Sequence, residues 1–356
     1  MKKSLVAVAL FGAFAAQAQA QSAVVIYGTV DAGVTKATGS TTAIGARNNN
    51  KLGFMGTEDL GNGLKALFQL EMRYSPDTGT LEGNGTRPLF QGQSRVGLQG
   101  AFGTVRLGRG LTAFQESSTR FEPWSGIPSA AGFQTDIAVA GYTSDPFGGL
   151  GNTLTSNSRN RFSNAVFYNT PVFSGFQANA TVGTKEASNN ASFDGGVTYA
   201  AGQEAFAVPY SLSATYDNGP FAAMAAYERN ANETTLWSVA GSFNPMQPLK
   251  LMASYQQQDQ DKSDTIAIQN GKTKAWVLGA NYTMGPGKFL AGYGQKDPDF
   301  NVKTKQVSLG YEYSLSKRTY VYVDASNKKQ PATSFVNGAA QGTSVNSYGV
   351  GVSHNF

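Results

Sequence analysis

The sequence predicts a transmembrane antiparallel β-barrel of about sixteen strands, with one long constriction loop folded into its lumen. Three observations support this fold class. Short segments alternate between apolar and polar residues, aromatic residues cluster at segment ends, and tight turns alternate with long polar connections. A period of two gives each strand two different surroundings, and here we expect lipid on one face and water on the other.

The N-terminus has the features of a secretory signal peptide. Two lysines precede an apolar run over residues 5–16, and Ala18-Gln19-Ala20 fits a small-x-small cleavage site. We expect residues 1–20 to be removed, with cleavage after Ala18 as a near alternative, and residues 21–356 to form a single barrel domain. The apolar run is too short to span a membrane as a helix.

Composition narrows the classes of function. The formal charge of +5 falls to +3 when the two signal-peptide lysines leave, so the total charge gives no reason to expect a nucleic-acid partner. The chain has no Cys, which excludes disulfides and thiolate chemistry. No later run is long and apolar enough for a spanning helix.

Alternating segments recur from residue 24 to the C-terminus, for example over 24–34, 64–74, 210–216 and 307–313. A soluble sandwich would alternate too, but mid-strand charges suit a water-filled interior, and tyrosines near strand ends suit the aromatic girdles of a membrane barrel. These tyrosines are Tyr27, Tyr74, Tyr168, Tyr216, Tyr255, Tyr282, Tyr313 and Tyr348. An even number of strands, about sixteen, returns both termini to one side and leaves an aqueous channel.

The connections differ in length on the two sides of the predicted barrel. Tight turns rich in Gly, Asn and Pro, such as 217–220 and 285–287, alternate with long polar segments, such as 36–50 and 75–93. This asymmetry is typical of barrels in the bacterial outer membrane. Residues 193–200 are either an extra strand or part of a structured loop.

The C-terminal strand is predicted to pair with the first one and so leave no open edge. Its apolar face, which we expect to contact lipid and to act as a barrel-insertion signal, consists of Tyr348, Val350, Val352, His354 and Phe356. His354 is the only His in the chain and follows Ser353. Parity places these two side chains on opposite faces, so they cannot form the proton-transferring pair of a hydrolase.

We find no phosphate-binding Gly loop, no cluster of His and acids spaced for a metal, and no general acid–base pair. The sequence therefore predicts a protein that is not an enzyme and that has no cofactor and no metal site.

Residues 110–160 form a connection much longer than ordinary loops, which favours a functional role. The segment contains aromatic residues that a solvated loop would not need. Its acids are Glu116, Glu122, Asp136 and Asp145. We interpret it as the loop that folds into the lumen and narrows it, with an external surface loop as the alternative.

Parity also places basic side chains inside the barrel. Alternation with apolar neighbours predicts inward positions for Lys51, Arg73, Arg95, Arg106 and Arg161. Arg109 is out of phase and is expected at the strand end or in the loop. Together these bases would form a cationic band on one wall, opposed by the loop acids, and would attract anions and retard cations.

The chain resembles the Gram-negative general porins, in particular the group common in beta-proteobacteria. The stretches that carry the resemblance are 25–33, 51–61, 102–109, 164–171, 216–220, 315–319 and 354–356. The resemblance implies a sixteen-stranded barrel, a homotrimer, and passive diffusion through a constriction made by the third extracellular loop. It also implies eyelet bases at Lys51, Arg95, Arg106 and Arg161, and a loop tip at Asp145-Pro146-Phe147-Gly148. Family members usually have Arg where Lys51 stands.

We therefore expect an integral protein of the cell outer membrane, in contact with its lipid and lipopolysaccharide, that passes small hydrophilic solutes and ions with a mild preference for anions. The alternative is a substrate-specific outer-membrane channel, whose signature would be aromatic side chains following the lumen.

Overall fold

The computed structural model describes residues 23–82, 87–145, 160–184, 192–194, 197–199, 207–260, 271–299, 302–330, 335–336, 339–340 and 343–356. The signal-peptide prediction and the predicted loop tip after Asp145 lie outside these residues. Among the described helices, none is long and apolar enough to cross a membrane.

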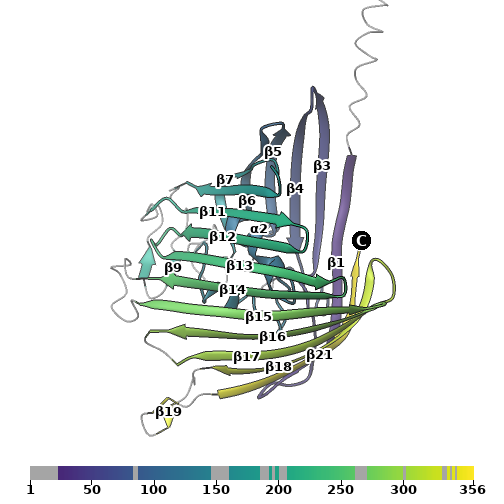
Figure 1. The fold of residues 1–356 in the computed structure, drawn as a ribbon, viewed down its shortest axis with the longest axis vertical. Coiled ribbons are helices and arrows are strands. Elements are labelled where there is room, and N and C mark those ends of the chain that lie inside the picture. Colours follow the sequence, from purple (N-terminus) through teal and green to yellow (C-terminus); the bar gives the residue numbers. More distant parts are fainter. Residues whose placement is uncertain are drawn as a thin grey trace, which may run out of the picture.

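One antiparallel sheet closes on itself to form the barrel (Figure 1). Its long strands are β1 (Ala23–Ala37), β3 (Lys51–Gly61), β4 (Leu64–Arg73), β5 (Gln93–Gly100), β6 (Gly103–Leu111), β7 (Arg161–Asn169), β8 (Phe176–Gly183), β11 (Tyr210–Asn218), β12 (Phe221–Arg229), β13 (Thr235–Met246), β14 (Leu249–Asp259), β15 (Lys272–Met284), β16 (Gly287–Pro298), β17 (Thr304–Ser314), β18 (Thr319–Gln330) and β21 (Thr343–Asn355). The sheet of the described residues has 17 strands, and without the three-residue β2 (Ala43–Gly45) it is the predicted barrel of sixteen.

The barrel closes between β1 and β21, as predicted. Their register runs from Thr29 opposite Asn355 to Ala37 opposite Ser347. The first half of β1 instead pairs with β3, from Ala23 opposite Thr57 to Thr29 opposite Lys51. This pairing continues β1 beyond the end of β21.

The faces of the strands have the polarity that the sequence predicts. Outward-facing apolar side chains remain exposed in the isolated chain, for example Val96 (58%) and Leu309 (62%). Inward-facing polar side chains are covered, for example Ser211 and Gln256, each 0% exposed. This distribution is that of a barrel whose outside meets hydrocarbon, the reverse of a soluble sandwich.

Tight turns join the strands at one end of the barrel. Gly219 and Gly285 lie in two of these turns with φ of 56° and 58°, a left-handed conformation that Gly adopts without steric cost. In β21, Val350 and His354 face outward and Ser353 is fully buried on the inner side. The prediction that Ser353 and His354 point apart is therefore confirmed, and His354 Nδ1 instead lies 2.9 Å from Thr319 Oγ1.

Among the described residues, four further short strands lie outside the barrel sheet. β9 (Ser192–Asp194) and β10 (Val197–Tyr199) form a hairpin of their own, and β19 (Phe335–Val336) pairs with β20 (Ala339–Ala340). Within 193–200, the described strands pair with each other and not with the barrel sheet, which favours the structured loop over an extra barrel strand.

The long connection after β6 contains α2 (Ala113–Ser118) and the 3-10 helices η1 (Thr119–Phe121) and η2 (Ile137–Val139). α2 contacts β11 and β12, and η2 contacts β14, β15 and β16 (Figure 1). Residues 112–145, which we call the lumen loop, therefore pack against the inner side of the wall.

Candidate functional site

Wall side chains fix the start of the lumen loop through hydrogen bonds to α2. Thr112 Oγ1 accepts from Gln115 N at 3.3 Å and caps the helix. Thr181 Oγ1 of β8 accepts from Ala113 N at 3.1 Å, and Ser211 Oγ of β11 accepts from Phe114 N at 3.0 Å. These bonds satisfy backbone donors at the start of the helix and orient its next side chain, Glu116.

Apolar packing holds the middle of the lumen loop. Its aromatic residues Phe114, Phe121, Trp124, Phe133 and Tyr142 are all at most 1% exposed. They pack with inward-facing wall residues of β12, β13, β15 and β16: Met224, Leu236, Val277 and Leu290. Gly292 of β16 provides space for this contact, because a Cβ there would lie 2.5 Å from Phe133 Cε2.

Polar contacts hold the far side of the lumen loop to the opposite wall. Asp136 forms ion pairs with Lys296 of β16 and Lys328 of β18. Trp124 Nε1 donates to Asp324 Oδ1 at 3.1 Å, and Gln256 Nε2 donates to Ile137 O at 2.9 Å. Burial works against the charged form of Asp136, but the two lysines outweigh it and hold the pKa of that carboxyl below its usual range.

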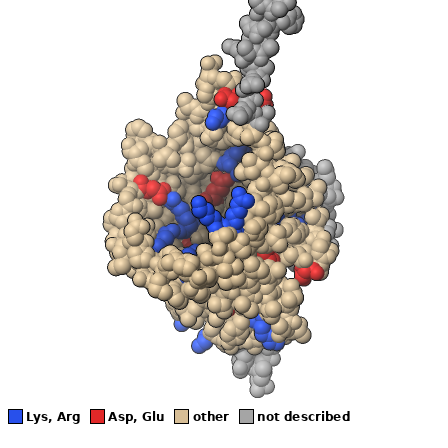
Figure 2. All heavy atoms as spheres, turned by 90° about the vertical axis from the view of Figure 1, so that its right-hand side faces the viewer, with Lys and Arg blue, Asp and Glu red and all other residues tan. Residues whose placement is uncertain are grey.

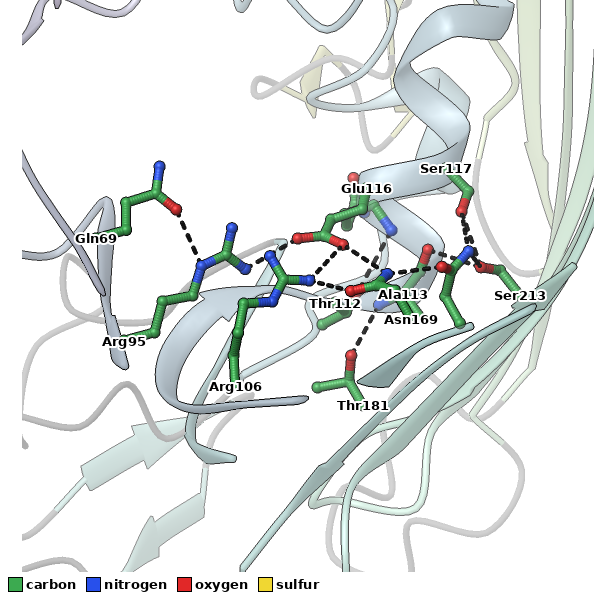
Figure 3. Close-up of polar contacts among 12 residues, drawn as sticks. Gln69, Arg95, Arg106, Thr112, Ala113, Glu116, Ser117, Asn169, Thr181 and Ser213 are labelled. Atoms are coloured by element: carbon green, nitrogen blue, oxygen red, sulfur yellow. Dashed lines mark hydrogen bonds and ion pairs between the residues drawn. The ribbon is translucent and has the colours of Figure 1, made fainter. Parts of the chain in front are cut away.

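Arg95 and Arg106 project from β5 and β6 toward Glu116 of α2 (Figure 3). Arg95 Nη1 lies 3.0 Å from Glu116 Oε1, and Arg106 Nη2 lies 3.4 Å from Glu116 Oε2. Arg95 Nε also donates to Gln69 Oε1 at 3.0 Å, and Arg106 donates to Asn169 Oδ1. One carboxylate thus bridges two guanidinium groups, which leaves this cluster with a net positive charge.

Beside these arginines lies an open cavity of about 250 Å³. Val25, Met55, Leu67 and Gln69 line it together with Arg95 and Arg106. Arg95 and Arg106 therefore border open volume beside α2 and the wall.

Lys51 and Arg73 are directly opposed across β3 and β4. Both lie near Glu71, with Lys51 Nζ 3.9 Å from Oε2 and Arg73 Nε 3.7 Å from Oε1. The Lys51 side chain is 36% exposed, which is more than the side chain of Arg73, Arg95, Arg106 or Arg109.

The register between β6 and β7 shifts between Gly108 and Gly110, where β7 has one residue more than β6, and Gly108 has a φ of 127°. Arg109 follows Gly108 within β6 and lies on the inner side, where Nη1 donates to Ser163 Oγ at 2.5 Å and lies 3.8 Å from Asp145 Oδ2. Arg161 differs from the expectation of a water-facing base. It is 6% exposed, and its Nε donates to Gly92 O at 2.6 Å, so it braces the wall.

The four loop acids are not arranged as a row facing the bases across an open gap. Glu116 touches the bases directly, Asp145 lies near Arg109, and Asp136 pairs with lysines of the other wall. Glu122 is 1% exposed and accepts a hydrogen bond from Trp124 N at 3.1 Å, so it stabilises a turn of the loop. Burial raises the pKa of Glu122 to about 7.

Sequence reasoning missed several inward-facing cations. Arg47, in the connection between β2 and β3, inserts between Glu312 and Asp324, with its guanidinium carbon 4.7 Å from the centre of the Tyr322 ring. Lys250 of β14 donates to Arg120 O at 2.9 Å, and Lys288 of β16 lies 3.1 Å from Glu312. Parity with the apolar neighbours of Lys250 and Lys288 could have predicted both, whereas nothing in the pattern marks Arg47.

Cations gather in the hollow of the barrel. Figure 2 views the end that carries the turn between β13 and β14, and the charged side chains in its hollow are mostly Lys and Arg. On the wall from β3 to β7, the bases Lys51, Arg73, Arg95, Arg106 and Arg109 contact the acids Glu71, Glu116 and Asp145. Five bases against three acids leave this wall positive.

A closed barrel with a charged interior limits the families to which the chain can belong, and comparison with known proteins identifies the family. A family model described as Gram-negative porin matches residues 5–333. The chain belongs to the Gram-negative porins. It is 32% identical to outer membrane porin protein 32 of Delftia acidovorans, and the alignment covers 100% of both chains. It is also 28% identical, again over 100% of both chains, to an outer membrane porin protein of Bordetella pertussis.

Solved structures give the same fold. A porin from Comamonas acidovorans, described as anion-selective, superposes with a TM-score of 0.73 at 27% identity, covering 94% of this chain and 100% of the other. OmpT of Vibrio cholerae, in a structure described as the trimer form, has a TM-score of 0.65 at 14% identity over 94% and 99% of the chains, a likeness of fold alone. This porin is thus a β-barrel channel of the outer membrane and not an enzyme, as the sequence predicted.

Proposed function

We propose that this porin is a trimeric, water-filled general diffusion channel that passes small hydrophilic solutes and ions with a mild preference for anions. The observation that carries the proposal is the surplus of basic side chains on the wall from β3 to β7. There, Arg95 and Arg106 share the single carboxylate of Glu116. Low-dielectric walls focus the field of such a surplus on the lumen.

The preference is expected to be mild because most lumen bases have an acid close by. Glu71 lies between Lys51 and Arg73, and Asp145 lies 3.8 Å from Arg109. Partial neutralisation lowers the potential without reversing its sign. The relative described as anion-selective supports the same direction.

A substrate-specific channel is the second candidate, and the structure gives it less support. Its expected signature is a row of aromatic side chains along the lumen, for which the aromatics of the long loop were the candidates. Phe114, Phe121, Trp124, Phe133 and Tyr142 are instead buried between the loop and the wall. In the described part of the loop they are therefore packing residues.

The trimer is supported by a solved relative of the same fold that is described in a trimer form. The barrel exterior also carries the exposed apolar surface that partners in the membrane require, which here would be outer-membrane lipid, lipopolysaccharide and two further copies of the chain. Three equal current steps per insertion are the expected functional sign of a trimer.

The test is the reversal potential of the purified protein in a planar bilayer under a salt gradient. We expect a weak anion preference in the wild type and a shift toward cations in the R95Q/R106Q double variant. R318Q, which removes an exposed charge in a tight turn, is the control and should not shift it. Marked cation selectivity of the wild type, or an unchanged potential in R95Q/R106Q, would contradict the proposal. Saturable block of the current by a single sugar or peptide would favour the specific channel.

A further inference from the structure

Two lysines lie directly opposite each other on the outer wall of the barrel. Lys305 of β17 and Lys329 of β18 are partners in the antiparallel register. Both are exposed, and both share the outward parity of apolar neighbours such as Val307 and Val323. Like charges at directly opposed positions destabilise a sheet, so this pair costs free energy unless an anion lies over it.

The pair lies at the level of an aromatic girdle. Lys305 is opposite Gln295 of β16, which is in turn opposite Trp276 of β15. The ring of Trp276 packs against Tyr293, with centroids 5.3 Å apart. Toward the tight turns, the next outward positions of β17 are the exposed apolar residues Val307 and Leu309. Girdle aromatics mark the boundary between hydrocarbon and headgroups, so the lysines reach the headgroup layer.

This boundary belongs to the outer leaflet. β17 begins and β18 ends at the side opposite the tight turns. In outer-membrane barrels the short turns face the periplasm, so this end faces the cell exterior.

In the part of the chain that the structure describes, the pair has no acidic partner. The cross-strand row that contains it continues from Lys329 to Ser344 and has no acid among the residues named in it. Neighbouring rim lysines do have acids, since Lys272 lies 3.6 Å from Asp259 and Lys303 lies 2.7 Å from Asp297. Within the described ranges, no ion pair involves Lys305 or Lys329.

We propose that Lys305 and Lys329 form a binding site for the phosphate groups of a phosphorylated glycolipid in the outer leaflet. The inference deepens the lipopolysaccharide contact proposed above by naming where it is made, and it is independent of the ion selectivity of the pore. Two ammonium groups on adjacent strands match a multivalent anionic headgroup, and Gln295 offers an amide donor beside them. The acyl chains would lie along the apolar belt of β17 and β18.

The test measures binding of lipid A with two phosphates to the trimer in neutral detergent by native mass spectrometry. The dephosphorylated lipid is the paired ligand. Each lysine near an anionic lipid surface contributes about 1 kcal/mol, so K305Q/K329Q should weaken binding of the phosphorylated form by at least about tenfold. K305R/K329R should retain binding. K317Q, which removes an exposed lysine from a tight turn at the other end, should bind as the wild type does.

Several outcomes would overturn the proposal. Equal binding of the phosphorylated lipid by the wild type and K305Q/K329Q would rule out the site. Equal binding of the phosphorylated and dephosphorylated lipids by the wild type would also rule it out. Competition by millimolar inorganic phosphate would point to a free ion. Loss of trimers in K305Q/K329Q without lipid would place the pair at a subunit contact. The reversal potential in bilayers without lipid A should be unchanged in this variant, so failure here is distinguishable from failure of the proposed channel function.

Discussion

Glu116 controls how much of the charge of Arg95 and Arg106 reaches the lumen. Its carboxylate lies 3.0 Å from one guanidinium and 3.4 Å from the other, and its helix is fixed independently by Thr112, Thr181 and Ser211. Glu116→Gln should therefore remove one negative charge while α2 keeps its place.

The magnitude follows from Coulomb's law. An ion passing about 6 Å from this carboxylate in water interacts with it by about 0.7 kcal/mol, which screening at 0.1 M salt reduces to about 0.4 kcal/mol. Removing the carboxylate lowers the energy of anions and raises that of cations by this amount. The ratio of anion to cation permeability should then rise about fourfold.

The assay is the reversal potential of E116Q under a tenfold gradient of a monovalent salt, with E58Q as the matched control because Glu58 is exposed in β3 near a tight turn. The shift should shrink at high salt as screening increases. If E116Q leaves the potential unchanged while the single-channel conductance shows an intact pore, then Arg95 and Arg106 do not face the ion path. A shift toward cations would refute the electrostatic reasoning itself.

Three further outcomes are expected. Asp136→Asn should leave Lys296 and Lys328 without their shared carboxylate. It should therefore lower the free energy of unfolding by about 1–3 kcal/mol and increase the current noise. The control D77N, at an exposed acid, should change neither quantity. Gly292→Ala places a Cβ 2.5 Å from Phe133 Cε2 and should lower the stability by about 1–3 kcal/mol in denaturant titrations; G349A, whose Cβ meets only Thr35 Cγ2 at 3.9 Å, should have little effect. Burial raises the pKa of Glu122 from 4.5 to about 7, so the stabilisation from this carboxyl is fully present below pH 4.5 and is lost, up to about 3 kcal/mol, as the pH rises through 7. The E122Q variant should abolish this pH dependence of the free energy of unfolding. A wild type that is equally stable at pH 5 and pH 7.5 would contradict the prediction.

The barrel was predictable because lipid and water sort side chains by parity. Val96 and Leu98 are apolar and were predicted to face hydrocarbon, so alternation predicted that Arg95 faces the lumen. In the structure, Val96 and Leu98 are exposed on the outside and Arg95 lies on the inner side. Parity fails where the backbone is irregular. At the register shift between β6 and β7, Arg109 lies on the inner side, although alternation from Arg106 predicts the outer side.

The partners of the bases could not be predicted in the same way. Parity gives the face of Arg161 but not the carbonyl of Gly92 that binds it, because that contact depends on how neighbouring strands meet. The loop acids were visible as residues, but their partners depend on where the loop packs. Gly292 and Leu290 were the residues that could have indicated where the loop packs, since small and apolar residues on a lumen face suit contact with another segment of the chain.

Closure between β1 and β21 constrains how this molecule can be made. Thr29 and Asn355, which bond across the seam, are 326 positions apart, so the ring joins segments from the two extremes of the described chain. A nascent polypeptide stopped before residue 347 would be an open sheet with two unpaired margins. Chaperones must therefore keep the polypeptide unfolded and apart from other copies until its whole length has reached the membrane, because an incomplete sheet would aggregate through its unpaired edges.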